Sequence, residues 1–403
     1  MTIGSNNWES LTLGDLGKWI TGSTPPSSDS ASRGEDVLFV TPTDIGYGGK
    51  LGAVSRRISN AGADRVRRIR PGSVILVCIG TIGKVAWTDL EITTNQQINV
   101  LEVDTARHDI KFIHWLLASP HIQEQLWANS TSTTVALLNK RTLERIPTQV
   151  PSLEEQKRIV EALDSYLEKI DLTVSELHSD LRKLDELERS ARFSEFERAN
   201  AANANSIVQL KDVTVKAKSI DPKTLGVDSF KYVDISSIST DLESPQILGS
   251  TETSKAPSRA RQQIMEGDIV FSTVRPYQKK IALIKEDLNG QIASTGFCVL
   301  RPIGDLVDSR YLYHYLKSDM LLDQVLPLQR GASYPAVGDT DVKQSTMPLP
   351  DLATQQAIAS NLDVVVGAVK VLKSQLETTI ERAQVLRRAL LHKAFSGQLN
   401  KEK

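Results

Sequence analysis

The chain has 403 residues, which at roughly 150 residues per domain corresponds to two or three domains. Its 48 Lys and Arg nearly balance 49 Asp and Glu, for a net charge of −1. This balance excludes a uniformly basic nucleic-acid coat and a polybasic membrane binder, but it allows a local basic patch. No apolar run reaches the ~18 residues of a transmembrane candidate. Since the first residues also lack the pattern of a signal peptide, we expect a cytoplasmic protein.

In chain order, apolar runs and turn residues predict a mixed α/β globule, a long helix, a second α/β globule and a second long helix. Strands are expected in the first globule at 37–40, 74–79, 84–88 and 98–103, followed by a helix at 110–127. In the second globule they are expected at 232–235, 269–272, 280–284 and 297–300, followed by a helix at 309–325. The predicted domains are 1–150, 151–205, 206–350 and 351–403.

The sequence contains an internal repeat, in which the best-matched segments are 199 residues apart. Pro151-Ser-Leu-Glu-Glu-Gln-Lys-Arg-Ile returns as Pro350-Asp-Leu-Ala-Thr-Gln-Gln-Ala-Ile, and the segment at Asp109 returns at Asp308. Matches in the same order continue upstream with small gaps, as between Leu13 and Leu210. Ordered matches at a nearly constant shift indicate an internal duplication.

The two long helices have an apolar seam with a spacing close to 3.5 residues, which is typical of coiled coils. The seam residues are expected at Ile159, Leu163, Tyr166, Ile170, Val174, Leu177, Leu181 and Leu184 in the first helix. In the second they are expected at Ile358, Leu362, Val365, Val369, Leu372, Leu376, Ile380, Ala383, Leu386 and Leu390. We predict that the helices pair as an antiparallel coiled coil about a pseudo-twofold axis. The alternative is that each helix packs on its own globule alone.

The sequence shows no recognisable catalytic or nucleotide-binding motif. The segment from Gly80 to Lys84 has too few residues between its glycines for a Walker loop, and Val85 stands where Ser or Thr is needed. The chain also has no methyltransferase tetrapeptide and no clear nuclease pattern, so we expect a binding protein with no catalytic and no metal-binding residues. An unrecognised methyltransferase or nuclease, or a duplicated scaffold for protein interactions, is the alternative.

Several polar segments could contact DNA. An arginine cluster lies between Arg56 and Arg70, where guanidinium groups could hold phosphates or pair with acidic side chains elsewhere in the fold. Polar loops at matched places in the two globules could offer amides, arginines and an aromatic ring to base edges, or could only tie loops together. The candidate DNA-binding residues are Arg56, Arg57, Arg67, Arg68, Thr81, Lys84, Asn95, Gln96, Gln97, Asn139, Lys140, Arg141, Thr273, Arg275, Tyr277, Gln278, Lys279, Lys280, Arg330, Ser333 and Tyr334.

Three features of the sequence together resemble the specificity subunits of type I restriction–modification enzymes. The first is the helix start at Pro151, and the second is the pair of segments Gly80-Thr-Ile-Gly-Lys-Val and Thr94-Asn-Gln-Gln-Ile-Asn. The third is the ending Leu391-His-Lys-Ala-Phe-Ser-Gly-Gln-Leu. The resemblance covers essentially the whole chain. It implies two target-recognition domains at 1–150 and 206–350, each reading one half of a split DNA sequence.

The resemblance also implies helical regions that dock methyltransferase subunits, together with a motor–nuclease subunit in the same complex. S-adenosylmethionine, ATP and Mg would belong to those partners, and this chain would carry no cofactor. The docking residues expected from the helix starts are Gln156, Ile159, Leu163, Gln355, Ile358 and Leu362. Because the charged Glu-Lys-Arg set of the first helix is replaced by Thr354, Gln356 and Ala357 in the second, equivalent docking at both helices stays open.

Overall fold

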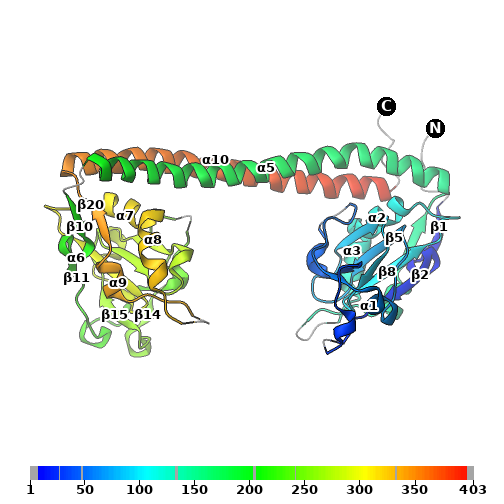
Figure 1. The fold of residues 1–403 in the computed structure, drawn as a ribbon, viewed down its shortest axis with the longest axis horizontal. Coiled ribbons are helices and arrows are strands. Elements are labelled where there is room, and N and C mark those ends of the chain that lie inside the picture. The colour runs from blue at the N-terminus through cyan, green and yellow to red at the C-terminus, as the bar shows by residue number, and fades with distance from the viewer. Residues whose placement is uncertain are drawn as a thin grey trace. The chain divides into compact units, whose positions relative to one another are not determined.

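The computed structural model describes residues 8–26, 28–46, 49–131, 135–202, 206–240, 242–331 and 334–396. The chain forms two compact units, one made of residues 1–176 and 379–403 and the other of residues 177–378 (Figure 1). Each unit therefore contains one globule together with parts of both long helices. No helix among the described residues is long and apolar enough to cross a membrane.

The first globule is built on a four-stranded antiparallel sheet with strand order β2-β8-β5-β6. A three-stranded sheet, β4-β3-β7, and the two-stranded pair β1-β9 complete it. Its strands are β1 Glu9–Thr12, β2 Gly17–Thr21, β3 Val37–Val40, β4 Arg57–Ile58, β5 Ser73–Val77, β6 Val85–Thr88, β7 Ile92–Thr94, β8 Ile98–Val103 and β9 Pro147–Val150. Its helices are α1 Asn60–Arg65, α2 Ile110–Ala118, α3 Pro120–Ala128 and α4 Lys140–Glu144.

The second globule repeats this plan with the four-stranded sheet β11-β19-β16-β17, the three-stranded sheet β13-β18-β15 and the pair β10-β20, and it adds the pair β12-β14. Its strands are β10 Ile207–Gln209, β11 Thr214–Lys216, β12 Ser229–Phe230, β13 Tyr232–Val233, β14 Thr251–Glu252, β15 Ala260–Gln263, β16 Ile269–Ser272, β17 Ile281–Leu283, β18 Ile292–Ser294, β19 Phe297–Pro302 and β20 Thr346–Pro348. Its helices are α6 Leu210–Val213, α7 Ser309–Lys317, α8 Asp319–Val325 and α9 Asp339–Lys343. The equivalent strand orders of the four-stranded sheets confirm the duplication at the level of topology.

Both faces of each four-stranded sheet are buried, which explains why the central strands read as continuous apolar runs. In β5, Val74 and Leu76 face a core shared with α2 and α3, while Ile75 and Val77 face a core beside the three-stranded sheet. Alternate residues of a strand point to opposite faces, so a strand between two cores needs apolar residues throughout.

The single helices predicted at 110–127 and 309–325 are each two helices, because the chain leaves the helical conformation at a serine. Ser119 (ψ 146°) separates α2 from α3 and precedes Pro120, whose ring disfavours a helical conformation in the residue before it. Ser318 (ψ 158°) separates α7 from α8 although Asp319 follows it. Both serines donate from Oγ to the carbonyl of the residue three positions earlier, at 2.6 Å.

The long helices are α5 Leu153–Ala202 and α10 Leu352–Phe395. A side chain caps the start of each: the Oγ of Ser152 accepts from the Glu155 N–H at 3.4 Å, and the carboxylate of Asp351 accepts from the Thr354 N–H at 2.8 Å. In the first unit Asp171 of α5 pairs with Arg387 of α10. In the second unit Asp185 of α5 pairs with Lys373 of α10 at 2.7 Å. Residues later in α5 thus contact residues earlier in α10, which confirms antiparallel pairing.

Candidate nucleic-acid interface

The polar loops singled out in the two globules are assembled by the same backbone hydrogen bonds. In the first globule, the loop after β5 bonds to two other segments: Cys78 N–H donates to the Gln97 carbonyl (2.8 Å) and Gly80 N–H to the Ala136 carbonyl (2.9 Å). The loop after β16 does the same in the second globule, where Thr273 N–H donates to Gly296 (3.0 Å) and Arg275 N–H to Pro335 (2.8 Å). Three loops far apart in sequence therefore meet in each globule.

Within this assembly the first globule presents Thr81, Gln96 and Arg141 as exposed side chains. The side chain of Gln96 also accepts from the Thr24 hydroxyl at 2.7 Å, and other predicted residues of this globule are likewise used to connect segments of the fold. Asn95 donates to the Gln97 side chain at 2.9 Å, Lys84 donates to the Pro42 carbonyl at 3.2 Å, and Asn139 caps α4 by accepting from Thr142 at 2.9 Å. The side chain of Lys140 pairs with Glu144 at 3.5 Å on the same helix.

In the second globule the exposed side chains are those of Tyr277, Gln278, Tyr334 and Arg330. The guanidinium of Arg275 lies 5.5 Å from the centre of the Tyr334 ring, a cation–π contact that connects two of the loops.

Other predicted residues of the second globule are held inside it. Thr273 is buried and donates to the Gly296 carbonyl at 3.0 Å, and Lys280 donates to the Ile235 carbonyl at 2.9 Å, as Lys84 does to Pro42 in the first globule. Arg330, by contrast, is exposed, and it pairs with Asp341 at 3.3 Å at the surface. Ser333 lies outside the described residues.

The four predicted residues of the arginine cluster differ in how far the fold already pairs them. Arg68 is paired within the fold: it bonds to Asp64 at 2.8 Å and to Glu91 at 2.5 Å, and these hydrogen bonds raise its pKa. Arg56, Arg57 and Arg67 are exposed, and the hydrogen bonds of Arg57 and Arg67 go to backbone carbonyls at 3.2 and 2.7 Å. The guanidinium of Arg56 also lies 4.4 Å from the centre of the Phe39 ring. None of these three exposed arginines has an ion pair like those of Arg68 among the described residues.

The six residues expected to dock a partner are buried in the chain's own cores. Gln156 and Gln355 have no exposed surface, and Ile159, Leu163, Ile358 and Leu362 are each at most 7% exposed. They hold each long helix on its own globule and leave almost none of their surface accessible.

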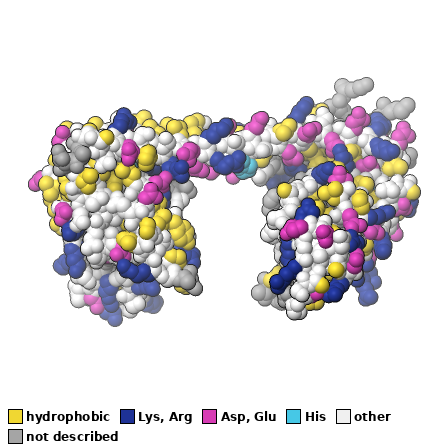
Figure 2. All heavy atoms as spheres, viewed as in Figure 1, with side chains coloured by type: hydrophobic (Ala, Val, Ile, Leu, Met, Phe, Trp, Pro, Cys, Tyr) yellow, Lys and Arg dark blue, Asp and Glu magenta, His cyan; other side chains and the backbone are white. Residues whose placement is uncertain are grey.

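Large apolar side chains are instead exposed elsewhere on the long helices, and Figure 2 shows hydrophobic side chains at the helix surface. On α5 they are Tyr166, Leu172, Leu187 and Phe193, and on α10 they are Val364, Val371, Leu372, Val385 and Leu386. Three of these residues, Tyr166, Leu372 and Leu386, had been assigned to the seam, and sequence reasoning missed the other six. A signal was present, because Val364, Val371 and Val385 are spaced by multiples of seven outside the predicted seam.

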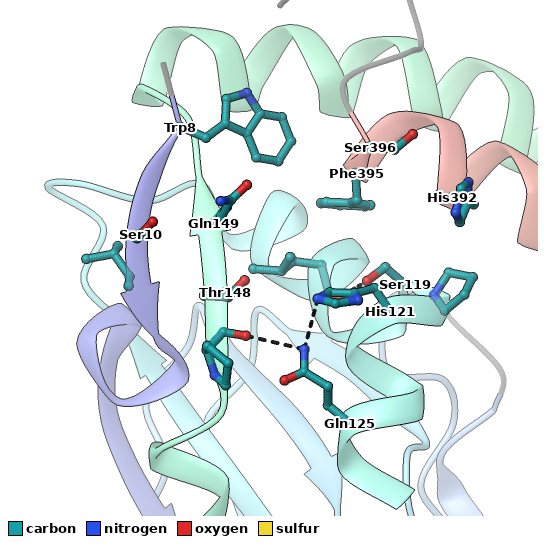
Figure 3. A pocket seen from close by; sticks show the side chains of 14 residues that line it. Trp8, Ser10, Ser119, His121, Gln125, Thr148, Gln149, His392, Phe395 and Ser396 are labelled. Atoms are coloured by element: carbon teal, nitrogen blue, oxygen red, sulfur yellow. Dashed lines mark hydrogen bonds between the residues drawn. The ribbon is translucent and has the colours of Figure 1, made fainter. Parts of the chain in front are cut away.

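A groove of about 540 Å³ in the first unit lies among β1, β9, α3 and the end of α10 (Figure 3). His121 and Gln125 are hydrogen-bonded at 3.0 Å within it, and Trp8 and Phe395 line it. At the matched place in the second globule the ring of Tyr315 is buried and its hydroxyl donates to the Thr346 carbonyl at 2.5 Å. The first globule has Leu116 at this position, where it lines the groove.

Comparisons with known proteins agree with this duplicated architecture. The family described as type I restriction modification DNA specificity domain matches the chain twice, over residues 5–180 and 205–382. The type I restriction enzyme EcoBI specificity subunit of Escherichia coli is 21% identical over 98% of this chain and 86% of the relative. The HindI specificity subunit of Haemophilus influenzae is 30% identical over 40% of this chain and 36% of the relative.

Solved structures share the fold. A chain from work on complex assembly and conformational transition of the type I R-M system superposes with a TM-score of 0.67 at 20% identity, covering 98% of this chain and 99% of that one. The HsdS subunit of Thermoanaerobacter tengcongensis gives a TM-score of 0.50 at 20% identity, with 98% of both chains covered. Because the family match covers both globules and most of both long helices, the chain belongs to the type I restriction modification DNA specificity family.

Proposed function

We propose that this chain is the DNA-recognition subunit of a type I restriction–modification complex and that each globule reads one half of a split duplex target. The observation that carries the proposal is the recurrence of the same three-loop assembly in both globules. Each assembly presents hydrogen-bonding side chains of the kinds that read base edges, Gln96 and Arg141 in the first globule and Gln278 in the second.

Phosphate contacts would position the chain on the duplex, and base contacts would specify the sequence. The exposed guanidinium groups of Arg56, Arg57 and Arg67 support a phosphate role in the first globule. The chain itself would carry out no chemical step. Methyl transfer and DNA cleavage would belong to partner subunits that hold S-adenosylmethionine, ATP and Mg.

The test is DNA binding by the chain co-expressed with the methyltransferase subunit of its own system. We expect sequence-dependent binding whose affinity falls steeply with salt, and methylation mapping of host DNA should return one split target. Binding that ignores the sequence, or binding to proteins alone, would contradict the proposal and favour an interaction scaffold.

We further propose that the methyltransferase subunits dock on the apolar side chains exposed along the long helices. Val364 is 73% exposed and Val371 57% exposed, and an apolar stripe with heptad spacing matches a partner helix. Charged side chains between the two helices, such as Lys373, pair with acidic residues of this chain. They would therefore not interfere with a partner helix on the apolar stripe.

The docking proposal is tested by placing a charge in the stripe. Val371→Glu should lower recovery of the co-expressed methyltransferase subunit at least about tenfold, since an unpaired charge would be buried in the contact. Gln384→Glu is the matched control: it is also exposed on α10, thirteen residues further on and so about 140° round the helix. Equal recovery of the partner with both variants would reject the stripe as the docking surface.

A further inference from the structure

The loops after β5 and β16 share a backbone feature that the sequences alone do not reveal. Each loop turns at two residues with positive φ: Gly80 (81°) and Gly83 (94°) in the first globule, Arg275 (49°) and Lys279 (48°) in the second. Throughout the described ranges, Arg275 and Lys279 are the two residues other than glycine with a positive φ. Glycine adopts this conformation freely, whereas a residue with a Cβ is strained in it, so the surroundings must hold the second loop in place.

At the first of these positions the two globules form equivalent backbone hydrogen bonds. The N–H of Arg275 donates to the Pro335 carbonyl, as that of Gly80 donates to Ala136, and the Arg275 side chain rests on Tyr334. The second position differs between the globules. In the first, the side chain of Gln123 donates to the Gly83 carbonyl at 2.9 Å, and any Cβ on Gly83 would lie 2.1 Å from Gln123.

In the second globule a salt bridge takes the place of that contact. The Nζ of Lys279 lies 2.7 Å from the carboxylate of Asp319, and each side chain is about 30% exposed. The same carboxylate lies 3.4 Å from Nε of Arg189 on α5. At the position matching Asp319 the first globule has Pro120, so the strained lysine and its acidic partner occur together in one copy and are both missing from the other.

We propose that Asp319 is a positioning residue for DNA recognition, which holds Lys279 in its left-handed conformation and so fixes the turn that presents Tyr277 and Gln278. The inference rests on the proposed function, because it assigns a role within the reading of one half-site. Through Arg189, the same carboxylate ties this turn to α5. All of these residues belong to the second unit, and Tyr277, Gln278, Lys279, Asp319 and Arg189 line one groove of about 750 Å³.

Lys279 was also a candidate for direct DNA contact, and the two roles predict opposite effects. If Lys279 held a phosphate, then removing Asp319 would free the ammonium group and tighten binding to every sequence. If Asp319 positions the turn, then removing it loosens the turn and weakens recognition of one half-site, and glycine at position 279 restores recognition because glycine tolerates the positive φ.

The first measurement is hydrogen–deuterium exchange on the full-length chain, which does not depend on DNA. In the native turn the N–H groups of Gln278 and Lys279 donate to Arg275 and Pro276, each at 2.9 Å. Asp319→Ala should speed their exchange at least about fivefold, and the double variant Asp319→Ala/Lys279→Gly should bring it back toward the wild-type rate. Asp323→Asn, which alters an exposed carboxylate on the same helix, is the control. Unchanged exchange in Asp319→Ala would overturn the proposal.

The second measurement is methylation mapping in cells that carry the complete system. Asp319→Ala should relax the sequence at one half of the target and leave the other half unchanged, and the double variant should regain the original sequence. Tighter binding of Asp319→Ala to all sequences, or relaxation of both halves, would overturn the positioning role. If the wild-type complex showed no sequence-specific methylation, then the proposed function would fail while the exchange result would still stand.

Discussion

At the scale of single residues, two buried glutamines hold the long helices on the globules in the same way. The side-chain amide of Gln156 donates to the carbonyls of Arg107 and Pro151 and accepts from the Asp109 N–H. Gln355 repeats this with Leu306, Pro350 and Asp308, at 3.0, 2.8 and 2.9 Å. An amide is the side-chain group that can satisfy two carbonyls and one N–H at once, which gives a physical reason for glutamine at both positions.

Gln156→Leu should therefore destabilise the chain by about 2–4 kcal/mol, because it leaves three buried backbone groups without partners. Gln355→Leu should cost a similar amount. The urea dependence of unfolding measures both. Gln356→Leu, at an exposed neighbouring position, is expected to stay within about 0.5 kcal/mol of the wild type. A loss for Gln356→Leu as large as that for Gln355→Leu would contradict this account.

The buried imidazole of His114 gives the first unit a pH dependence. Its Nε2 accepts the Gly49 N–H at 2.9 Å, and burial together with the nearby charge of Arg387 lowers its pKa to about 3. The unfolded chain takes up this proton near pH 6.5. Between those two values the unfolded state binds more protons, so stability is fully present above pH 6.5 and is lost as the pH falls.

Lowering the pH from 7.0 to 5.5 should cost the wild type about 1 kcal/mol more than it costs His114→Gln. The other histidines contribute to both proteins and cancel in the comparison. The free energy of unfolding at the two pH values checks this. Equal pH dependence of the two proteins would mean that His114 does not stay neutral in the folded chain.

The arginine cluster supports a prediction about salt. Arg56→Ala, Arg57→Ala and Arg67→Ala should each weaken binding to all sequences and lower the salt slope by about one unit, as expected for lost phosphate contacts. Arg68→Ala should leave the slope unchanged, because its guanidinium is already paired with Asp64 and Glu91. DNA titrations at several salt concentrations decide the matter, and a lowered slope for Arg68→Ala would show that the internal pairs open on binding.

At the scale of the elements, the heptad seam was predicted well where both helices present apolar residues and poorly where long charged side chains take part. Tyr166, Leu372 and Leu386 were placed in the seam, yet they are 56%, 46% and 51% exposed. Lys373 and Arg387, one residue after each of those leucines, are partly buried and reach acidic residues of α5. An apolar pattern does not distinguish these positions, because lysine and arginine can bury their stems while their charges stay paired.

The longer strands could be predicted because their apolar runs are bounded by turn residues, and β3, β8 and β16 have the expected bounds. Two-residue strands such as β4 and β12 carry too few residues for a period to appear. The loop assembly and the contact between Lys279 and Asp319 could not be predicted either, since they join residues 40 positions apart through the fold.

At the scale of the whole molecule, the internal repeat leads to a prediction of modular recognition. Replacing residues 206–350 with the matching segment of a related subunit should change one half of the recognised sequence and leave the other half intact. The reason is that the loop assembly of each globule is formed from that globule alone. Methylation mapping of cells carrying the chimera tests this. A change in both halves would indicate one composite reader.

The way in which the long helices are divided between the two units suggests how the duplicated chain evolved. Near the end of α5, Phe196 is buried against Tyr311 and Tyr315 of the second globule, and at the end of α10, Phe395 lies 5.3 Å from Phe112 of the first. A half-length ancestor with one globule and one helix would have had no helix end of its own to cover its globule. Two such chains could have covered each other, so the duplication is best understood as the fusion of a symmetric homodimer. Such a dimer would have recognised two identical half-sites, and divergence of the copies after fusion would have allowed an asymmetric target.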